Sequence, residues 1–392
     1  MTKSRLSSWP SFNDAEIEAA TETLRSNAVN YWTGSRGREF EKAFARWNGS
    51  AHAVALANGT LAIDVALKAL GVGPGDEVIV TPRSFMASVS SIVLAGAKPV
   101  FADVDLDSGN ITAASIESVI TPATKAIVPV HLAGWPCDMD EIMALARSRG
   151  LFVIEDCAQA HGAMIGNRAV GSIGDVGAWS FCQDKIMTTG GEGGMVTTQD
   201  EGLWSAMWSY KDHGKDWDAV YNQAHEPGYR WVHRSFGTNW RMLEIQAAIG
   251  ILQLKSVDAW VARRTEIAMR LRDVLLRFPD LIRAPVPADE FTHAYYRFYG
   301  YLNRDAISTD WSRDRIIAEI SGAGFPVFHG SCSELYLEGA FEGTGLRPSE
   351  RLPNARKLGE TSLMFLTHPT ITDEQIDGYA SVVSSVLERA AR

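Results

Sequence analysis

The sequence predicts an α/β protein with a large, mostly parallel sheet domain over residues 1–250 and a smaller C-terminal α+β domain over residues 251–392. Short apolar segments alternate with amphipathic segments through the first half, a pattern typical of a parallel sheet with crossover helices. Near Arg241 the pattern changes to long helical stretches and aromatic, strand-like runs. A chain of 392 residues is also too long for one ordinary core and suits two domains.

Hydrophobic periodicity places the elements in order. In the first domain the spacing predicts helices over 13–25, 39–47, 60–70, 86–94, 113–119 and 139–149. Apolar runs predict the strands 53–57, 77–80, 99–102, 126–130, 152–155, 176–181 and 195–198. In the second domain the pattern predicts helices over 242–257, 260–277, 312–322 and 373–391, with an aromatic strand over 294–302. The carboxyl ends of parallel strands are where ligands bind.

Composition excludes several classes of function. The chain has 37 Lys plus Arg against 47 Asp plus Glu, a net charge of −10, which argues against nucleic acid or an anionic membrane as partner. Its 4 cysteines are far apart, so we expect reduced thiols and no metal site. No signal-peptide core and no membrane-length apolar run is present, which predicts a cytoplasmic protein.

The most informative residue is Lys185. It lies between the apolar run 176–181 and a glycine-rich turn over 190–194, after which a strand-like pattern resumes. This arrangement can hold one amine at the edge of a sheet. A lysine buried there can have a lowered pKa and form a Schiff base. The alternative is a solvated lysine in a β-turn.

Polar or aromatic residues follow several other strands. Asp156 can pair with a protonated pyridine nitrogen or cap a helix. The turn 58–60 can bind an anion at a helix N-terminus or serve only as a turn. Phe85 can stack on a flat cofactor or belong to the core. Asn239 and Arg241 can reach an anion or cap the helix that follows.

Together, these segments resemble the DegT/DnrJ/EryC1/StrS sugar aminotransferase family, pyridoxal-phosphate (PLP) enzymes with the aspartate-aminotransferase fold. The motifs that carry the resemblance are Glu155-Asp-Cys-Ala-Gln-Ala-His-Gly162, the segment 185–194 and Gly237-Thr-Asn-Trp-Arg-Met242. The resemblance covers nearly the whole chain, from the opening at 32–41 to the close at 366–375.

The resemblance implies roles for the residues around the cofactor ring. Lys185 would hold PLP as the internal aldimine and then shuttle the proton. Asp156 would pair with the pyridine nitrogen, and so keep the ring electron-poor. Gln159 would contact the ring near its phenolic oxygen, and Phe85 would stack on its face.

It also implies how the phosphate is held. Gly59, Thr60 and Ser180 would bind it from within the chain, and Asn239 would reach the phosphate of the partner subunit's PLP. The active unit would then be a homodimer with shared active sites. For six further residues a structural role is an equal alternative: His131, His161, Glu192, Arg241, His329 and His368.

The implied reaction moves an amino group from L-glutamate to a keto sugar. The amino-acid sequence at 30–34 and 181–186 resembles that of a branch of the family that aminates an 8-keto derivative of 3-deoxy-octulosonate, a sugar acid of lipopolysaccharide. The substrate candidates are Trp32, Arg83 and His329, with Arg83 proposed for the carboxylate. The alternative acceptor is a nucleotide-linked keto hexose. The other class of function is a PLP-dependent sugar dehydratase or a non-catalytic regulator. The presence of Lys185 disfavours this class.

Two segments depart from the family pattern. Cys182, Asp184 and Ile186 are unusual beside the lysine, although the spacing from Ser180 to Lys185 is kept. Residues 204–240 are rich in aromatic side chains, which can form a sugar-facing wall or pack at a dimer interface: Trp204, Trp208, Tyr210, Trp217, Tyr221, Tyr229, Trp231 and Trp240.

Overall fold

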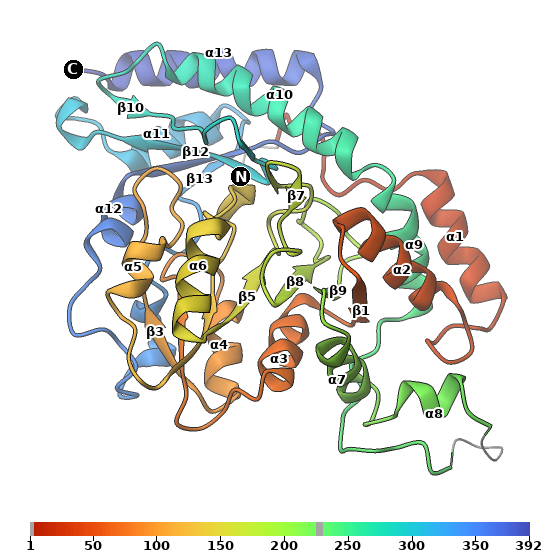
Figure 1. Ribbon diagram of the computed structural model, residues 1–392. Helices are drawn as coiled ribbons and strands as arrows, with labels where there is room; N and C mark the ends of the chain where they lie inside the picture. The colour runs from red at the N-terminus through yellow and green to blue at the C-terminus, as the bar shows by residue number, and fades with distance from the viewer. Residues whose placement is uncertain (1–3, 225–229) are drawn as a thin grey trace.

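The computed structural model describes residues 4–224 and 230–392, and its body is one seven-stranded sheet (Figure 1). The strand order is β1-β9-β8-β5-β4-β2-β3. Each pair from β8 to β3 is parallel, whereas β9 is antiparallel to both its neighbours. The prediction of a largely parallel sheet is confirmed. The strands are β1 His52–Leu56, β2 Glu77–Val80, β3 Lys98–Phe101, β4 Thr124–Val128, β5 Phe152–Asp156, β8 Val176–Ser180 and β9 Gly194–Thr198.

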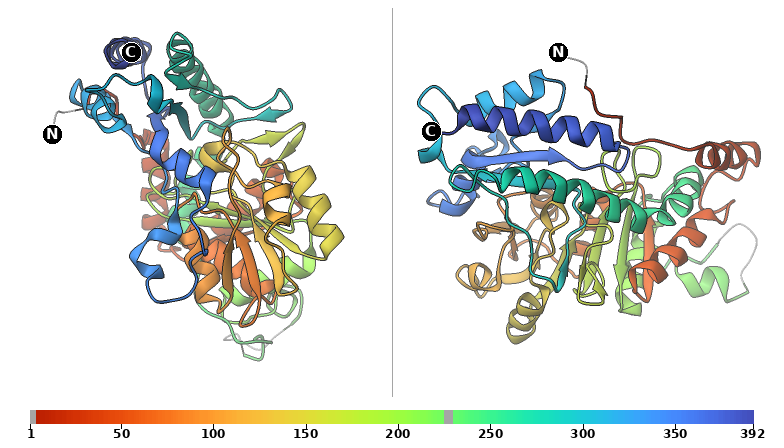
Figure 2. Two further views of the ribbon diagram at one scale, coloured as in Figure 1. Left: turned by 90° about the vertical axis from the view of Figure 1, so that its left-hand side faces the viewer. Right: turned by 90° about the horizontal axis from the view of Figure 1, so that it is seen from above.

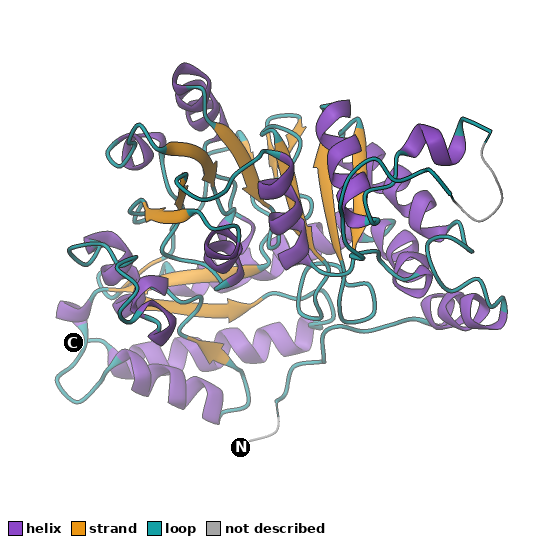
Figure 3. Cartoon of the chain, turned by 90° about the horizontal axis from the view of Figure 1, so that it is seen from below, coloured by secondary structure: helices purple, strands orange, loops and turns teal. Residues whose placement is uncertain are grey.

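Helices cover both faces of this sheet (Figure 3). Because side chains alternate along a strand, Val54 and Leu56 enter one core, and Ala53 and Ala55 enter the opposite one. One face carries α3 Gly59–Ala69, α4 Ala87–Leu94 and α7 Glu201–Lys211. The other carries α2 Arg36–Asn48, α5 Ala113–Glu117, α6 Met139–Arg149 and α9 Glu244–Leu254, with α1 Asp14–Arg25 packed on α9.

The C-terminal part forms an antiparallel sheet of order β10-β12-β14-β13. Figure 2 shows its two long helices, α10 Val257–Leu275 and α13 Asp373–Ala390, side by side. The remaining elements are β10 Ile282–Arg283, β12 Arg297–Leu302, α11 Arg313–Gly322, β13 Val327–Phe328, α12 Pro353–Thr361 and β14 Ser362–Leu366. A small third sheet joins β6 Met164–Ile165, β7 Arg168–Ala169 and β11 Phe291–Thr292.

Helix α10 belongs to both cores. Its first turns place Val257 and Val261 in the core of the large sheet, and its residues from Ile267 onward lie in the second core. Leu6 of the N-terminal segment also packs in the second core. The change of core therefore lies within a continuous helix, whose first residues follow the predicted boundary at residue 250. In the described part of the chain, no helix combines the length and apolarity needed to cross a membrane.

The aromatic-rich segment forms two elements that the spacing does not predict, α7 and α8 Trp217–Tyr221. The rings of Trp208 and Trp217 lie 4.8 Å apart, and Trp32 stacks on Tyr221 at 6.1 Å. A helix is usually recognised in a sequence by apolar residues on one face. Tryptophans on several faces hide that pattern. Tyr229 lies outside the described residues.

Candidate active site

A cleft of about 1110 Å³ opens at the carboxyl ends of the strands of the large sheet. The ends of β5 and β8 and the start of α3 form one side, and residues from the start of β12 and the segment 330–332 form the other. Seven of the predicted site residues line it: Gly59, Thr60, Phe85, Asp156, Gln159, Ser180 and Lys185. This location is the one where α/β sheets bind ligands.

Lys185 occupies the turn between β8 and β9, as predicted. Its side chain is 14% exposed, and its Nζ lies 4.0 Å from Asp184 Oδ1. The Tyr296 ring centroid is 5.1 Å from the same Nζ. The N-terminal segment also holds the turn, because the Trp9 indole donates to the Lys185 carbonyl oxygen at 2.9 Å.

The net shift of the Lys185 pKa is upward, not downward as considered from the sequence. Burial does lower this pKa, but Tyr296, Asp184 and Asp156 together outweigh that effect because each favours the charged amine. The charges around Lys185 therefore favour its ammonium form.

Asp156 is the last residue of β5, and its side chain is only 4% exposed. Ser88 Oγ donates to its Oδ2 at 2.7 Å, and the Ala158 N–H donates to its Oδ1 at 3.1 Å. Each oxygen accepts one bond and has a lone pair left. A buried carboxylate with unused acceptor capacity suits a protonated ring nitrogen.

Gln159 and Phe85 offer surfaces for a ring. Gln159 Oε1 accepts from the Ala133 N–H at 2.7 Å, which fixes the orientation of the amide and leaves its NH₂ group to donate. Phe85 lines the cleft with 71% of its surface exposed. A large apolar ring left open in a cleft is suited to stacking on a flat ligand.

The start of α3 forms an anion cradle. Asn58 caps the helix by accepting from the Leu61 N–H at 3.1 Å, and free N–H groups at such a terminus attract anions. Gly59 faces Ser180 so closely that an added Cβ would lie 2.5 Å from Ser180 Cβ. Only glycine leaves the cradle open here.

We therefore expect Gly59→Ala to weaken PLP binding by about tenfold or more, since overpacking of this size costs roughly 1–3 kcal/mol. Equilibrium dialysis against PLP measures the change. Gly73→Ala is the matched control because an added Cβ there would meet its nearest atom, the Ala95 carbonyl oxygen, at 3.8 Å. Equal affinities in Gly59→Ala and wild type would remove Gly59 from the cradle.

Four predicted residues do not line this cleft. Trp32 packs in the aromatic cluster, with Lys215 Nζ 3.6 Å from its ring centroid. His329 is half-exposed and its Nε2 lies 3.0 Å from Asp314. Asn239 is exposed on this chain. Arg83 is fully buried, where Nη1 donates to Ser333 Oγ at 2.8 Å.

Two of the candidate histidines, His131 and His161, are fully buried. His131 accepts from the Cys137 N–H through Nδ1 at 2.9 Å and reaches Glu155 through Nε2 at 3.1 Å. Glu155 also accepts three backbone N–H groups, so its carboxylate oxygens are already engaged within the cluster that it forms with His131 and Cys157. Burial, Lys185 and Arg264 lower the pKa of His161 to about 3.

Several cleft residues carry no prediction from the sequence. Ser88 positions Asp156, and Tyr296 and Arg297 approach Lys185 from the segment at the start of β12. Their only sequence signals are the aromatic run at 294–302 and the unusual Asp184. Glu192, one of the six further candidates, and Asp184 also line the cleft.

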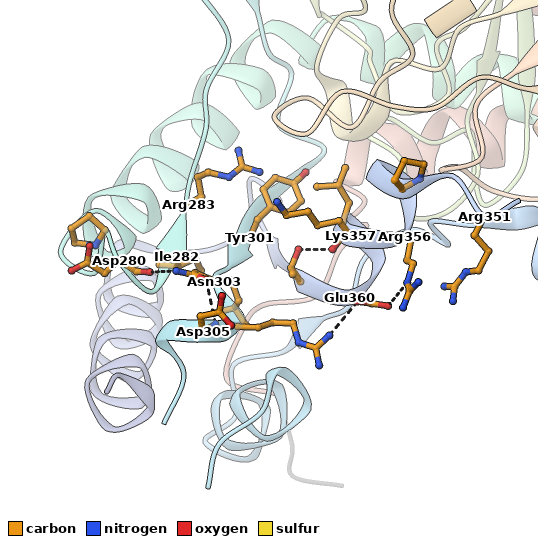
Figure 4. A pocket seen from close by; sticks show the side chains of 16 residues that line it. Asp280, Ile282, Arg283, Tyr301, Asn303, Asp305, Arg351, Arg356, Lys357 and Glu360 are labelled. Carbon is orange, nitrogen blue, oxygen red and sulfur yellow. Dashed lines mark hydrogen bonds and ion pairs between the residues drawn. The ribbon is translucent and has the colours of Figure 1, made fainter. Parts of the chain in front are cut away.

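A second hollow of about 1050 Å³ lies on the small domain, away from Lys185 (Figure 4). It is lined by several arginines, but these are already paired: Arg304 and Arg356 with Glu360, Arg351 with Glu334, and Arg283 with Asp107. We assign the chemistry to the cleft because it holds the buried amine and carboxylate together.

Comparison with known proteins gives the family. The profile of the DegT/DnrJ/EryC1/StrS aminotransferase family matches residues 10–386. The chain belongs to this family. It is a PLP-dependent sugar aminotransferase, and the cleft fits that cofactor because it offers an amine, a buried carboxylate, a stacking ring and an anion cradle. Lys185, Asp156, Phe85 and Gly59 would supply these four groups.

Relatives align along almost the whole chain. GDP-perosamine synthase of Caulobacter vibrioides is 38% identical over 95% of this chain and 98% of that protein. A UDP-N-acetyl-3-dehydro-α-D-glucosamine 3-aminotransferase of Acidithiobacillus ferrooxidans is 38% identical over 92% and 90%. The solved aminotransferase of Psychrobacter cryohalolentis is 57% identical with a TM-score of 0.97, over 98% of this chain and 99% of that chain.

Proposed function

We propose that this aminotransferase moves an amino group from L-glutamate to a keto sugar, with Lys185 as the residue that bonds the cofactor and carries the proton. The observation that carries the proposal is one cleft in which the Lys185 amine and the buried Asp156 carboxylate face the same space. Bound PLP supplies an electron sink beside the reacting carbon.

The residues then have separate tasks. Asp156, fixed by Ser88, holds a proton on the ring nitrogen. The cradle at Gly59 and Ser180 anchors the phosphate through both halves of the reaction. Lys185 takes a proton from one carbon and returns it to another, and its position supplies much of the rate.

Two classes of sugar are candidates for the amino-group acceptor. A nucleotide-linked keto hexose is supported by the names of the GDP-perosamine synthase and the UDP-sugar aminotransferase among the relatives, and by a cleft of about 1110 Å³. An 8-keto-3-deoxy-octulosonate of lipopolysaccharide is supported by the sequence at 30–34 and 181–186 alone, because Arg83, predicted to bind its carboxylate, is fully buried. The Nε and Nη2 of that residue are buried with no hydrogen-bond partner, and it lies outside the cleft lining.

The homodimer with shared sites is part of the same proposal. Asn239 is exposed and does not line its own cleft, and in the same segment Phe236 is 100% and Trp231 81% exposed. Exposed aromatic groups of this kind are typical of an interface. Sedimentation equilibrium measures the mass, and a monomer at working concentration would contradict this part. The cytoplasmic location and the link to lipopolysaccharide stay predictions.

The test is a glutamate assay on a panel of keto sugars: nucleotide-linked hexoses, the same hexoses without the nucleotide, and 8-keto-3-deoxy-octulosonate. We expect 2-oxoglutarate and one amino sugar to form in equal amounts with one class. Activity that needs the nucleotide assigns the first acceptor, and activity on the free sugar acid assigns the second. PLP binding without an amino product from any keto sugar would contradict the proposed function.

A further inference from the structure

Asp184 stands directly before Lys185 and connects the lysine turn to the small domain. Its Oδ2 accepts from the Tyr296 hydroxyl and from Arg297 Nη2, the latter at 3.3 Å. Its Oδ1 lies 4.0 Å from Lys185 Nζ. All four residues line the cleft. The carboxylate is therefore held between the amine and the segment where β12 starts.

The two partners leave Asp184 little freedom to turn. The Arg297 guanidinium carbon lies 4.1 Å from the centroid of the Tyr296 ring, so the two groups form one stacked pair against Oδ2. The Arg297 side chain is 11% exposed and the Tyr296 residue 6% exposed. With Oδ2 fixed, Oδ1 is directed toward Nζ. A separation of 4.0 Å exceeds a hydrogen bond, so the interaction is electrostatic.

Other charged or titratable groups also face this amine. They come from four places: Asp156 at the end of β5, Cys182 in the lysine turn, Tyr296 and Arg297 at the start of β12, and His161 with Arg264 behind the turn. His161 is neutral because its pKa is lowered to about 3 by burial, Lys185 and Arg264. Among the described residues, Asp184 is the carboxylate within ion-pair distance of Nζ.

We propose that Asp184 is a positioning residue that stabilises the ammonium form of the Lys185 amine when that amine is not bonded to the cofactor, with Tyr296 and Arg297 fixing its carboxylate. The inference rests on the proposed function, in which Lys185 carries a proton between two carbons. Nζ gains the proton as it becomes an ammonium ion and loses it when the second carbon is protonated. Asp184 stays a carboxylate throughout.

The expected effect follows from the distance. A unit charge at 4 Å shifts a pKa by roughly 0.7 units in a fully aqueous setting and about 3 units near a protein surface. The Asp184 side chain is 53% exposed, which places the effect near the lower limit. We expect Asp184→Asn to lower the pKa of Lys185 by about one unit. Since only the neutral amine reacts, its labelling then begins at lower pH.

The measurement uses the full-length chain. After removal of PLP, Lys185 is labelled with trinitrobenzenesulfonate across a pH series, and the labelled peptide is counted by mass spectrometry. A pH titration of the visible absorbance of the holoenzyme gives a second readout. Asp140→Asn is the matched control because it removes one carboxylate from a surface pair with Arg168, and we expect no shift from it.

A second variant, expected to shift the pKa of Lys185 in the opposite direction, distinguishes this electrostatic role from a purely structural contact between Asp184 and Arg297. Arg297→Gln removes a cation from Asp184 while the Tyr296 hydroxyl still holds Oδ2. The Asp184 charge is then less neutralised, so we expect the pKa of Lys185 to rise. Asp184→Glu keeps the charge and should stay near wild type. The proposal is overturned if Asp184→Asn matches wild type, or if Asp184→Asn and Arg297→Gln shift the pKa in the same direction. Labelling uses no substrate, so a failure of the sugar panel leaves this result standing.

Discussion

Replacing Lys185 by alanine should reduce turnover by at least about 10²–10⁴-fold, the usual contribution of a general base, before the loss of the bond to the cofactor is counted. The visible absorbance that this bond gives to the holoenzyme should also disappear. The reason is geometric, since Lys185 is the lysine that lines the cleft in the described residues. Stopped assays with glutamate and the accepted keto sugar measure the first effect, and absorbance spectra measure the second.

Two variants control this experiment. Lys98→Ala removes a lysine whose Nζ pairs with Glu77 at 2.9 Å, away from the cleft, and should leave turnover unchanged. Lys185→Arg keeps the positive charge without a nucleophilic amine, so it should be as inactive as the alanine variant. Turnover near wild type in either Lys185 variant would mean that another residue bonds the cofactor and carries the proton.

Asp156→Asn should give the second large effect. The amide keeps the volume and can still meet Ser88, but it loses the negative charge that holds a proton on the ring nitrogen. Removing a charged hydrogen bond costs about 1.5–3 kcal/mol, which corresponds to a loss of PLP affinity of roughly ten- to 150-fold. The rate should fall further because the ring is a poorer electron sink. PLP titration and single-turnover kinetics separate the two losses.

Ser88→Ala provides the comparison for this variant. It removes the 2.7 Å hydrogen bond to Asp156 Oδ2 but leaves the carboxylate in place. We expect a smaller loss than in Asp156→Asn, of about 1 kcal/mol in affinity. Equal losses in the two variants would mean that position, and not charge, is what the cofactor needs from Asp156.

Local patterns account for what could be predicted from the sequence. The strands of the large sheet are short apolar runs bounded by turns, and the site residues Asp156 and Gly59 follow such runs directly. At these positions chain order alone brings a side chain to the carboxyl end of the sheet. Local spacing and the family motifs were therefore enough to predict these residues of the site.

Tertiary placement accounts for what could not be predicted. Asp184 and Tyr296 are separated by 112 residues in sequence and meet only because β12 crosses above the lysine turn. The raised pKa of Lys185 results from charged groups on several elements. The residues next to the lysine in sequence are therefore not enough to predict it. Arg83 follows a strand as the site residues do, yet its side chain turns into the interior.

The continuity of α10 limits how the enzyme can close on its substrate. A helix whose first turns pack in one core and whose later turns pack in the other cannot act as a loose hinge without unwinding. Closure is therefore expected to proceed by small sliding movements between packed layers, or by loops at the cleft mouth, rather than by a swing of whole domains. For the same reason, cleavage by a protease should not release the C-terminal part as a separate folded unit.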